Sequence, residues 1–439
     1  MEWYLILLTM LVFLFILFFS GMPVAFAFMT LNFLAIFIWM GGEKGFLMVV
    51  PSAFQMLNNF TLIPIALFII MGMIIFHSGA GWLVIDALDR WVGRMPGRLS
   101  VLAVAAGTAF AAVSGVPMGT TAMLGSILVP EMRQRGYSKA MSLGPTLGGG
   151  GLALIIPPSS MAVILGGLAK ASIGDILIAC VVPGLVMSGL YIAYILYNAI
   201  RHPETAPKYE GRRFTLMEKI ASLRYILPLL GVVFMVTGVI FVGVATPTEA
   251  AATGALASFI LVAAYRKMSW GAIKKTLLSS MQVTVMVMMI IIGSVAFSQI
   301  LAYTGATRAL AQFATELPLP PILIVIAMQL VILVLGCFMD LISITMITVP
   351  IFIPIVNALG FDLVWFCTMM LINLGAATLS PPFGMLLFTI KGVVSSDVTM
   401  GDIIRAAIPY FIIGILTIGL VLAIPALALG LPELMKPAP

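Results

Sequence analysis

The stretch LIIPPSSM at residues 154–161 places two consecutive prolines inside one of the most apolar parts of the chain. Proline lacks a backbone N–H, and one proline in the interior of a helix costs about 3 kcal/mol. A related stretch, LSPPFGM, occupies residues 379–385. Both stretches therefore predict a helix that is interrupted within an apolar segment.

The composition of the chain is that of a polytopic membrane protein. Of its 439 residues, 62% are hydrophobic and 9% are charged, whereas soluble domains carry about 25% charged residues. Residues 3–42 contain no charge, which is enough for two spans of about 20 residues each. Glu2 stands where a signal peptide would be basic, so we expect a retained span there. The predicted fold class is all-α.

Other classes of protein fit the sequence poorly. The net charge of +6 comes from basic residues in short loops, which set membrane topology rather than bind nucleic acid. Three scattered cysteines and two histidines form no metal-binding or redox motif, and no cofactor is expected. The sequence contains no HExxH motif, no GxSxG motif and no P-loop, so neither an enzyme nor an ATP-driven pump is indicated.

The distribution of Arg and Lys predicts which segments cross the membrane, because these residues gather in cytoplasmic loops. Residues 98–133 are apolar in the middle but basic at both ends, and SGVPM interrupts them at 114–118. We therefore expect a re-entrant hairpin that enters from the cytoplasm and returns. Residues 139–173 then run outward as a broken helix, and the glycine run 148–151 within it would let neighbouring backbone approach closely.

The second half of the chain repeats this layout in the opposite sense. A second hairpin at residues 320–358 has acidic residues on its flanks, so it should enter from outside, and a broken helix at 362–391 follows it. A spacing of 27 residues occurs once in each half, between Pro130 and Pro157 and between Pro354 and Pro381. Two hairpins and two broken helices predict an inverted-topology repeat, as in ion-transporter-like elevator folds, with the irregular elements meeting at the membrane midplane.

These assignments divide the chain into five parts. The predicted parts are scaffold helices at 1–50, the first repeat of a transport domain at 51–200, a cytoplasmic loop with further scaffold helices at 201–275, the second transport repeat at 276–430, and a tail at 431–439.

Interrupted helices expose backbone groups that can bind ligands. Half-helix N-termini present N–H groups to anions, and unwound backbone presents carbonyl oxygens to cations. Gly151 ends the glycine run beside the first break and is included among the binding candidates. Hydroxyl groups near the tips and breaks would add neutral oxygen ligands suited to Na⁺, namely those of Ser114, Thr120, Thr121, Ser159, Ser160, Thr345, Thr378 and Ser380.

For four other features the sequence either leaves several roles open or favours a purely structural role. Asp340, at the second hairpin tip, is a candidate to ligate an ion, carry a proton or bind a cationic group of a substrate, or to be simply solvated. Asn373 is interpreted as forming a hydrogen bond between packed helices rather than as a ligand of an ion or substrate. TPTEAA at 246–251 is typical of a helix cap. The Met-rich MQVTVMVMMI at 281–290 is interpreted as core or lipid-facing packing.

Several of these stretches together resemble a known family. GGGLALIIPPSSM, ASIGDI followed by VPG, TPTEAAA, and PIFIPIVNALGFDLVWF leading to SPPFG are similar to the large membrane subunit of tripartite ATP-independent periplasmic (TRAP) transporters, the DctM-like family. The resemblance covers essentially the whole chain. It implies a Na⁺-coupled importer of organic acids, such as C4-dicarboxylates or sialic acid, in the bacterial inner membrane. It also implies an elevator movement of the transport domain against scaffold spans at 3–42 and 225–265.

The resemblance further implies partners and site residues. The partners are a periplasmic substrate-binding protein and a small four-span membrane subunit, which we expect on a separate chain. Family tips often read Ser-Gly-Ser-Ser, whereas this chain has SGVPM. Either backbone carbonyls or the Thr120 and Thr121 hydroxyls replace the two missing hydroxyls, or the contacts with the substrate differ from those of the family. The tips and breaks implied to line the substrate and sodium sites are Ser114, Gly115, Pro157, Pro158, Ser159, Gly336, Ser380, Pro381, Pro382 and Gly384. Sodium, the coupling ion, is expected near Ser114, Gly115, Pro157, Gly336, Thr345, Thr378 and Ser380.

Two other transport functions remain open at this point. A stand-alone sodium- or proton-coupled anion transporter would use the same inverted repeats without a binding protein. A channel would conduct without coupling. Transport of free substrate by the purified chain would favour the first alternative, and single-channel currents would favour the second.

Overall fold

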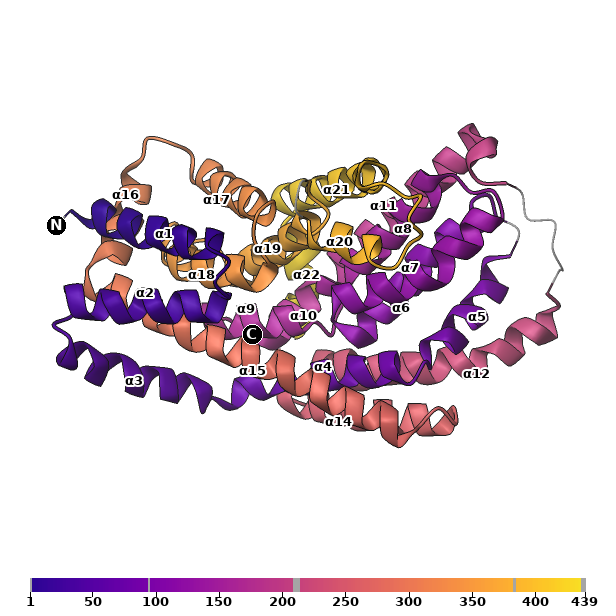
Figure 1. The fold of residues 1–439 in the computed structure, drawn as a ribbon, viewed down its shortest axis with the longest axis horizontal. Helices are drawn as coiled ribbons and strands as arrows, with labels where there is room; N and C mark the ends of the chain where they lie inside the picture. Colours follow the sequence, from indigo (N-terminus) through magenta and orange to yellow (C-terminus); the bar gives the residue numbers. More distant parts are fainter. Residues whose placement is uncertain (1, 94, 208–213, 382–383, 436–439) are drawn as a thin grey trace.

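The computed structural model describes residues 2–93, 95–207, 214–381 and 384–435, and this part of the chain is helical, with no strand (Figure 1). Seven helical segments in it are long and apolar enough to cross a membrane, namely Phe60–His77, Ile173–Arg201, Leu216–Phe241, Pro247–Ala264, Trp270–Tyr303, Leu341–Ala358 and Met400–Ala423. Length and composition thus confirm the predicted all-α polytopic fold.

An antiparallel helical hairpin occupies the position predicted at residues 98–133. Helices α6 (Arg98–Ser114) and α7 (Pro117–Gln134) pack against each other and are joined by Gly115 and Val116. Gly115 has a φ of +54°, and a Cβ at this position would lie 3.0 Å from the carbonyl oxygen of Pro158. Both the left-handed turn and the close approach therefore require glycine at the tip.

The first double proline interrupts a helix, as predicted. Helix α8 (Lys139–Gly151) tightens into the short turn η2 (Leu152–Leu154), and regular structure resumes only at α9 (Ser160–Ala169). The hydroxyl of Ser159 accepts a hydrogen bond from the backbone N–H of Ala162 at 3.3 Å. The new half-helix thus begins with an N-cap, which satisfies one of its free N–H groups.

The second half contains the same pair of elements. Helices α17 (Pro321–Gly336) and α18 (Leu341–Ala358) form the second hairpin, and α19 (Leu363–Ala377) is separated from α20 (Met385–Lys391) by an irregular stretch. In Figure 1 the hairpin of α6 and α7 enters from the right end of the molecule, and the hairpin of α17 and α18 enters from the left. This opposite orientation is the predicted inverted topology.

The two broken helices meet at equivalent glycines. Gly151 and Gly375 each lie six residues before the first proline of their break, at Pro157 and Pro381. A Cβ on Gly375 would lie 3.6 Å from the carbonyl oxygen of Gly151, and a Cβ on Gly151 would lie 3.9 Å from that of Gly375. The inverted repeats therefore touch through the same position of each copy, beside both interruptions.

The remaining helices surround these elements. In Figure 1, α3, α4, α12, α14 and α15 lie along the lower side, below the hairpins and broken helices. The remaining α-helices are α1 (Trp3–Phe19), α2 (Val24–Trp39), α3 (Glu43–Leu57), α4 (Ile63–His77), α5 (Gly81–Val92), α10 (Ile173–Ala179), α11 (Val181–Arg201), α12 (Leu216–Val233), α13 (Val239–Phe241), α14 (Pro247–Ala264), α15 (Trp270–Tyr303), α16 (Ala306–Glu316), α21 (Met400–Ala423) and α22 (Ala426–Met435). The short non-α helices are η1 (Phe60–Leu62), η3 (Pro203–Thr205) and the π-helix η4 (Phe234–Gly238).

Several predicted domain boundaries fall inside helices. The boundary after residue 50 lies within α3, the boundary after residue 275 lies within the 34-residue α15, and the boundary after residue 430 lies within α22. Helix continuity alone therefore does not separate a transport domain from a scaffold, and that division stays a prediction.

Two of the local packing interpretations are confirmed. The TPTEAA stretch starts α14 with a capping box, in which Thr246 and Glu249 bond reciprocally to each other's backbone N–H. The side-chain amide of Asn373 donates to the backbone carbonyl of Gln329 at 2.6 Å and to its side-chain oxygen at 2.9 Å. Asn373 thus ties α19 to α17 through buried hydrogen bonds.

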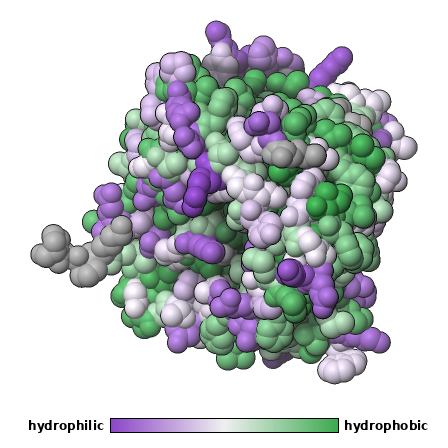
Figure 2. Space-filling view, turned by 90° about the vertical axis from the view of Figure 1, so that its left-hand side faces the viewer, coloured by the Kyte–Doolittle hydropathy of each residue, from purple (hydrophilic) through white to green (hydrophobic). Residues whose placement is uncertain are grey.

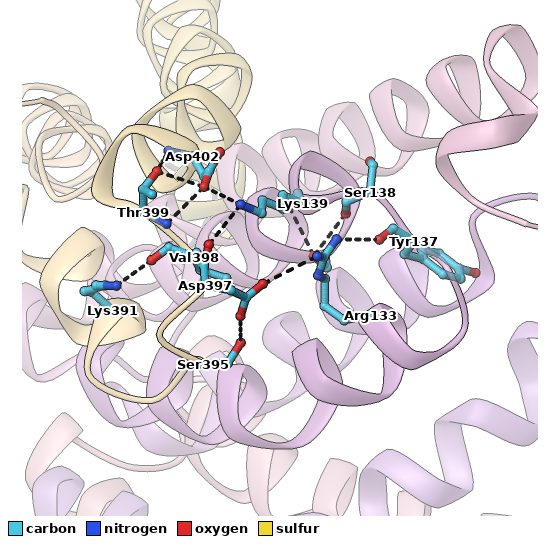
Figure 3. Close-up of polar contacts among 11 residues, drawn as sticks. Arg133, Tyr137, Ser138, Lys139, Lys391, Ser395, Asp397, Val398, Thr399 and Asp402 are labelled. Atoms are coloured by element: carbon cyan, nitrogen blue, oxygen red, sulfur yellow. Dashed lines mark hydrogen bonds and ion pairs between the residues drawn. The ribbon is translucent and has the colours of Figure 1, made fainter.

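Polar contacts join the base of the first hairpin to the loop that follows α20 (Figure 3). Lys139 donates to a carboxylate oxygen of Asp402 at 2.7 Å and to the backbone carbonyl of Asp397 at 3.0 Å. Arg133 lies 3.6 Å from the Asp397 carboxylate. The Ser395 hydroxyl donates to Asp397 and, with Arg133 and Lys139, holds the pKa of Asp397 below its usual value. These contacts place the two loops on one side of the molecule, as their basic residues predict.

The opposite end of the molecule is the one at which α1 begins. Figure 2 looks at this end and shows hydrophilic side chains spread among apolar ones over the face. Such mixed polarity fits an end that projects beyond the apolar part of a bilayer.

Candidate functional site

One cavity of about 760 Å³ brings together both hairpin tips and both helix breaks. The first tip contributes Gly115, Val116, Pro117 and Met118, and the first break contributes Leu154, Ser160, Met161 and Ile164; the second tip contributes Asp340, Leu341 and Ile342, and the second break contributes Thr378, Met385 and Leu386. The rest of the wall comes from Pro23–Phe26 at the start of α2, from Ile69 of α4 and from residues 281–290 of α15. The cavity thus lies where the four interrupted elements face α2, α4 and α15.

The first tip is hydrogen-bonded to the first break. The hydroxyl of Ser160 donates to the carbonyl oxygen of Gly115 at 3.2 Å, although the two residues are 45 positions apart. At the base of the tip, the hydroxyls of Ser114 and Thr120 lie 2.8 Å apart, and Thr120 also donates to the Val116 carbonyl at 3.2 Å. Hydroxyl and carbonyl oxygens therefore gather at the first tip.

Thr121 adds a buried oxygen without a partner in the described structure. Its side chain is fully buried, and its hydroxyl has no hydrogen-bond partner among the described residues. A Cβ on Gly150 would lie 1.8 Å from this hydroxyl, so the oxygen sits directly against the glycine run of α8. Buried hydroxyls normally find a partner, so the Thr121 oxygen is a candidate ligand.

The second tip is packed against the second break. A Cβ on Gly336 would lie 2.2 Å from the Cβ of Ala377, so glycine permits this contact. The Ser380 hydroxyl donates to the Ala377 carbonyl at 2.7 Å, and the Cys337 thiol lies 3.5 Å from the Ser380 hydroxyl oxygen. The second half of the site thus mirrors the first: a glycine at the tip allows close contact with an interrupted helix.

The break itself is folded back on its own backbone. Thr378 donates to the Gly375 carbonyl at 2.7 Å, and the N–H of Gly384 donates to the Ser380 carbonyl at 2.9 Å. A Cβ on Gly384 would lie 2.6 Å from the carbonyl oxygens of both Thr378 and Ser380. These carbonyls are therefore crowded around Gly384, and each accepts a backbone hydrogen bond, that of Thr378 from Leu386 and that of Ser380 from Gly384.

Asp340 is the only charged side chain among the described residues that line the cavity. Its carboxylate caps α18 by accepting from the N–H groups of Ile342 at 3.0 Å and Ser343 at 3.2 Å, and it also accepts from the Ser343 hydroxyl. The structure therefore gives Asp340 a capping role and at the same time places it at the wall of the cavity.

The predicted site residues occupy three kinds of position. The cavity wall contains Gly115, Ser160, Asp340 and Thr378. Other predicted residues lie in the tips, the breaks and the adjoining helices, without being part of that wall: Ser114, Thr120, Thr121, Gly151, Pro157, Pro158, Ser159, Gly336, Thr345, Ser380, Pro381 and Gly384. Pro382 lies outside the described residues.

Thr345 is buried within α18, where its hydroxyl donates to the Leu341 carbonyl at 2.8 Å. Thr345 and Thr121 are each 36 residues before the first proline of their break, so they occupy equivalent positions in the two repeats. Within the described residues, no group of three or more His, Cys, Asp or Glu side chains could hold a metal ion.

Sequence reasoning missed the methionines of the cavity wall. Met281, Met286 and Met289 of α15 line the cavity, whereas the sequence favours core or lipid-facing packing for their stretch. In a membrane protein the same apolar residue types face lipid, the core or an apolar cavity, so the local sequence does not distinguish these three environments. The turn Ser20-Gly21-Met22-Pro23 separates the two uncharged segments, and α2 begins directly after it, at the cavity.

Comparison with known proteins identifies the family. A family model described as "Tripartite ATP-independent periplasmic transporter, DctM component" matches residues 11–427. The chain belongs to the DctM family. It is therefore the large permease component of a TRAP transporter rather than an enzyme, and a multi-pass protein of the bacterial inner membrane.

Individual relatives agree with this assignment. The permease is 34% identical to the C4-dicarboxylate TRAP transporter large permease protein DctM of Pseudomonas aeruginosa, over 87% of this chain and 88% of the relative. It is 27% identical to the sialic acid TRAP transporter large permease protein SiaM of Vibrio cholerae, over 95% and 96%. Among solved structures, the YdaH transporter of Alcanivorax borkumensis superposes with a TM-score of 0.62 at 12% identity, over 90% and 91% of the two chains. The last similarity concerns the fold alone.

Proposed function

We propose that this permease imports an organic acid by sodium-coupled secondary transport, after a periplasmic substrate-binding protein delivers the acid. The observation that carries the proposal is the single cavity at which both tips and both breaks meet. Membership of a tripartite, ATP-independent family supports an energy source other than ATP and the need for partner proteins. The relatives named for C4-dicarboxylates and for sialic acid share the carboxylate as the common substrate group.

The charge of the cavity favours cation coupling. The wall offers no Lys or Arg among its described residues, and its one charged side chain is the carboxylate of Asp340. An organic anion brought next to Asp340 would be repelled, and burying unpaired charge at membrane depth costs several kcal/mol. Cations that bind with the anion would neutralise both charges, and each Na⁺ that enters would also gain about 2.3 kcal/mol per 100 mV of membrane potential.

The oxygen atoms at the two tips suit sodium. Near the first tip we place the ion among Ser114, Gly115 and Pro157, with the unpartnered hydroxyl of Thr121 as a further candidate. SGVPM lacks two hydroxyls of the usual family tip, so backbone carbonyls carry more of the binding there.

Near the second tip we place the ion among Gly336, Thr345, Thr378 and Ser380. The hydroxyls of these last three residues donate their protons to carbonyls, so their lone pairs remain available for a cation.

The substrate itself lies in the cavity in this proposal. Helix α9 begins at Ser160 beside the cavity, and its capped N-terminus would attract a carboxylate. The apolar wall, including Met281, Met286 and Met289, would contact the body of the acid. Because α2 and α15 form the facing wall, a sliding movement of the hairpins and broken helices against these helices would carry the cavity across the membrane, as an elevator does.

The proposal predicts specific behaviour in proteoliposomes. The permease is reconstituted with its small membrane subunit and its binding protein, and uptake of the acid that the binding protein binds is measured. We expect uptake with an inward Na⁺ gradient and none when K⁺ replaces Na⁺ at the same pH gradient. Uptake driven by a pH gradient alone, or uptake by the permease without the binding protein, would instead support the stand-alone sodium- or proton-coupled alternative.

A matched pair of variants links the coupling to the site. Thr378→Val removes a hydroxyl that lies at the cavity and donates to a backbone carbonyl of the preceding turn. Thr389→Val removes a hydroxyl that makes the same kind of bond, to the Met385 carbonyl, but lies outside the cavity wall. We expect Thr378→Val to raise the Na⁺ concentration needed for half-maximal uptake at least fivefold and Thr389→Val to leave it unchanged. Equal effects of the two variants would contradict the proposed sodium position.

A further inference from the structure

A second cavity lies away from the transport site, between α12 and α14. It has a volume of about 1160 Å³ and shares no lining residue with the cavity at the tips. Its walls come from α12, the π-helix η4 and α14, with Leu83 of α5 at the edge. We call this cavity the α12–α14 groove.

The two helices touch at both ends of the groove and leave it open between. At one end, a Cβ on Gly254 would lie 2.3 Å from a methyl group of Val236, so the helices are in direct contact there. At the other end, the Tyr265 hydroxyl donates to the Tyr225 carbonyl at 2.7 Å, and the two rings are 5.5 Å apart. Gly231 lies between these contacts, and a Cβ there would meet no atom within 4 Å.

The middle of the groove is apolar and exposed. The side chains of Phe234, Met235, Leu256 and Ile260 line it, and each is at least half exposed. Phe234, the first residue of η4, is ten positions after Arg224 of α12, which corresponds to about 15 Å along a helix. A groove of this length and polarity fits an acyl chain lying along the helices.

The tyrosine end of the groove is basic. Arg224, Arg266 and Lys267 all line it, and none forms an ion pair with another described residue. The guanidinium of Arg224 lies 4.7 Å from the centre of the Tyr225 ring, which holds it at the mouth of the groove. These residues belong to basic clusters that topology places on the cytoplasmic side. Three cations at the interface, next to an apolar channel, match an anionic head group joined to an acyl chain.

We propose that the α12–α14 groove binds one anionic phospholipid of the cytoplasmic leaflet. The phosphate binds Arg224, Arg266 and Lys267, and one acyl chain occupies the groove beside Gly231. The lipid would fill the open space beside Gly231, between α12 and α14. This proposal does not depend on the transported substrate or on sodium.

Native mass spectrometry of the full-length, detergent-purified permease tests the proposal. Phosphatidylglycerol and phosphatidylcholine with identical acyl chains are titrated separately. We expect the combined variant Arg224→Gln, Arg266→Gln and Lys267→Gln to retain at least fivefold less phosphatidylglycerol than the wild-type chain, with phosphatidylcholine unchanged. A control that neutralises the same number of exposed basic residues outside the groove, Arg201, Lys274 and Lys275, should bind both lipids like the wild type.

A second variant tests the acyl chain. Gly231→Leu places a side chain in the open middle of the groove and should displace both lipids at an unchanged thermal unfolding midpoint. Equal retention of phosphatidylglycerol by the groove variant and the wild type would overturn the proposal. Full competition by millimolar inorganic phosphate would overturn it in favour of a free-anion site. Loss of the lipid on addition of the small membrane subunit would assign the groove to that subunit instead.

Discussion

Replacing Gly115 with alanine tests whether the first tip must close on the first break. A left-handed conformation costs an L-residue about 1–2 kcal/mol. The new Cβ would also lie 3.0 Å from the Pro158 carbonyl oxygen and 3.3 Å from the Ser160 nitrogen, which is tighter than ordinary contact. Together these effects disfavour the closed tip by about 2 kcal/mol, which corresponds to a factor of about 30 in its population.

We expect this variant to fold but to bind sodium more weakly. In proteoliposomes, the Na⁺ concentration for half-maximal uptake should rise 5- to 30-fold in Gly115→Ala. Gly119→Ala is the matched control, because a Cβ there would have only Val116 as a neighbour, at 3.9 Å, and alanine favours the helix. A Gly115→Ala protein with a wild-type unfolding midpoint and a wild-type Na⁺ dependence would refute the reasoning.

Three further predictions address the charge of the cavity, the packing of the hairpin and the loop contacts. Asp340→Asn keeps a good N-cap for α18 but removes the only charge of the described cavity wall, so uptake should lose at least tenfold in Na⁺ affinity at an unchanged unfolding midpoint. Gly107→Val should lower the unfolding midpoint by several degrees, because a Cβ there would already lie 2.5 Å from the Cα of Gly149 and overpacking costs about 1–3 kcal/mol; Gly189→Ala, whose Cβ meets nothing within 4 Å, should not. Asp397→Asn should lower the unfolding midpoint at neutral pH, and this difference from wild type should shrink only as the pH falls below the usual pKa of a free aspartate, because the pKa of Asp397 is held low in the folded state. Scanning fluorimetry between pH 3 and pH 8 measures this last effect, and a difference that disappears already at pH 6 would contradict it.

The sequence was sufficient to predict the interrupted elements because their signals are local. Arg98 and Arg133 at both ends of an apolar segment exclude a simple crossing, and the two Pro-Pro pairs exclude continuous helices. Hydropathy alone would have been misleading, since α18 is long and apolar enough to cross a membrane, yet it pairs with α17 as one arm of a hairpin. The acidic flanks of that hairpin carried the information that hydropathy lacked.

The distant partners of these elements could not be read from local pattern. The hydrogen bond from Ser160 to the Gly115 carbonyl depends on the packing of α6 against α8, which involves Gly107 and Gly149. The π-helix at 234–238 lies in a stretch as apolar as the helices on either side of it, so its residue types do not mark it. In the structure, Val236 of this π-helix contacts Gly254 of α14. Non-local packing of this kind has no fixed sequence signature.

The contact between Gly151 and Gly375 has a mechanical consequence for the proposed transport cycle. A Cβ on Gly375 would lie 3.6 Å from the Gly151 carbonyl oxygen, so the two breaks meet through backbone atoms. No side chain at this contact could rearrange to absorb a shift of one break relative to the other. We therefore expect the two breaks to move together, and both tips, which contact them through Ser160 and Ala377, to move with them. An elevator requires this behaviour, since its substrate and ion sites must cross the membrane as one body. Replacing either glycine with leucine would separate the breaks, so such a variant should lose coupled uptake even where its helices still insert.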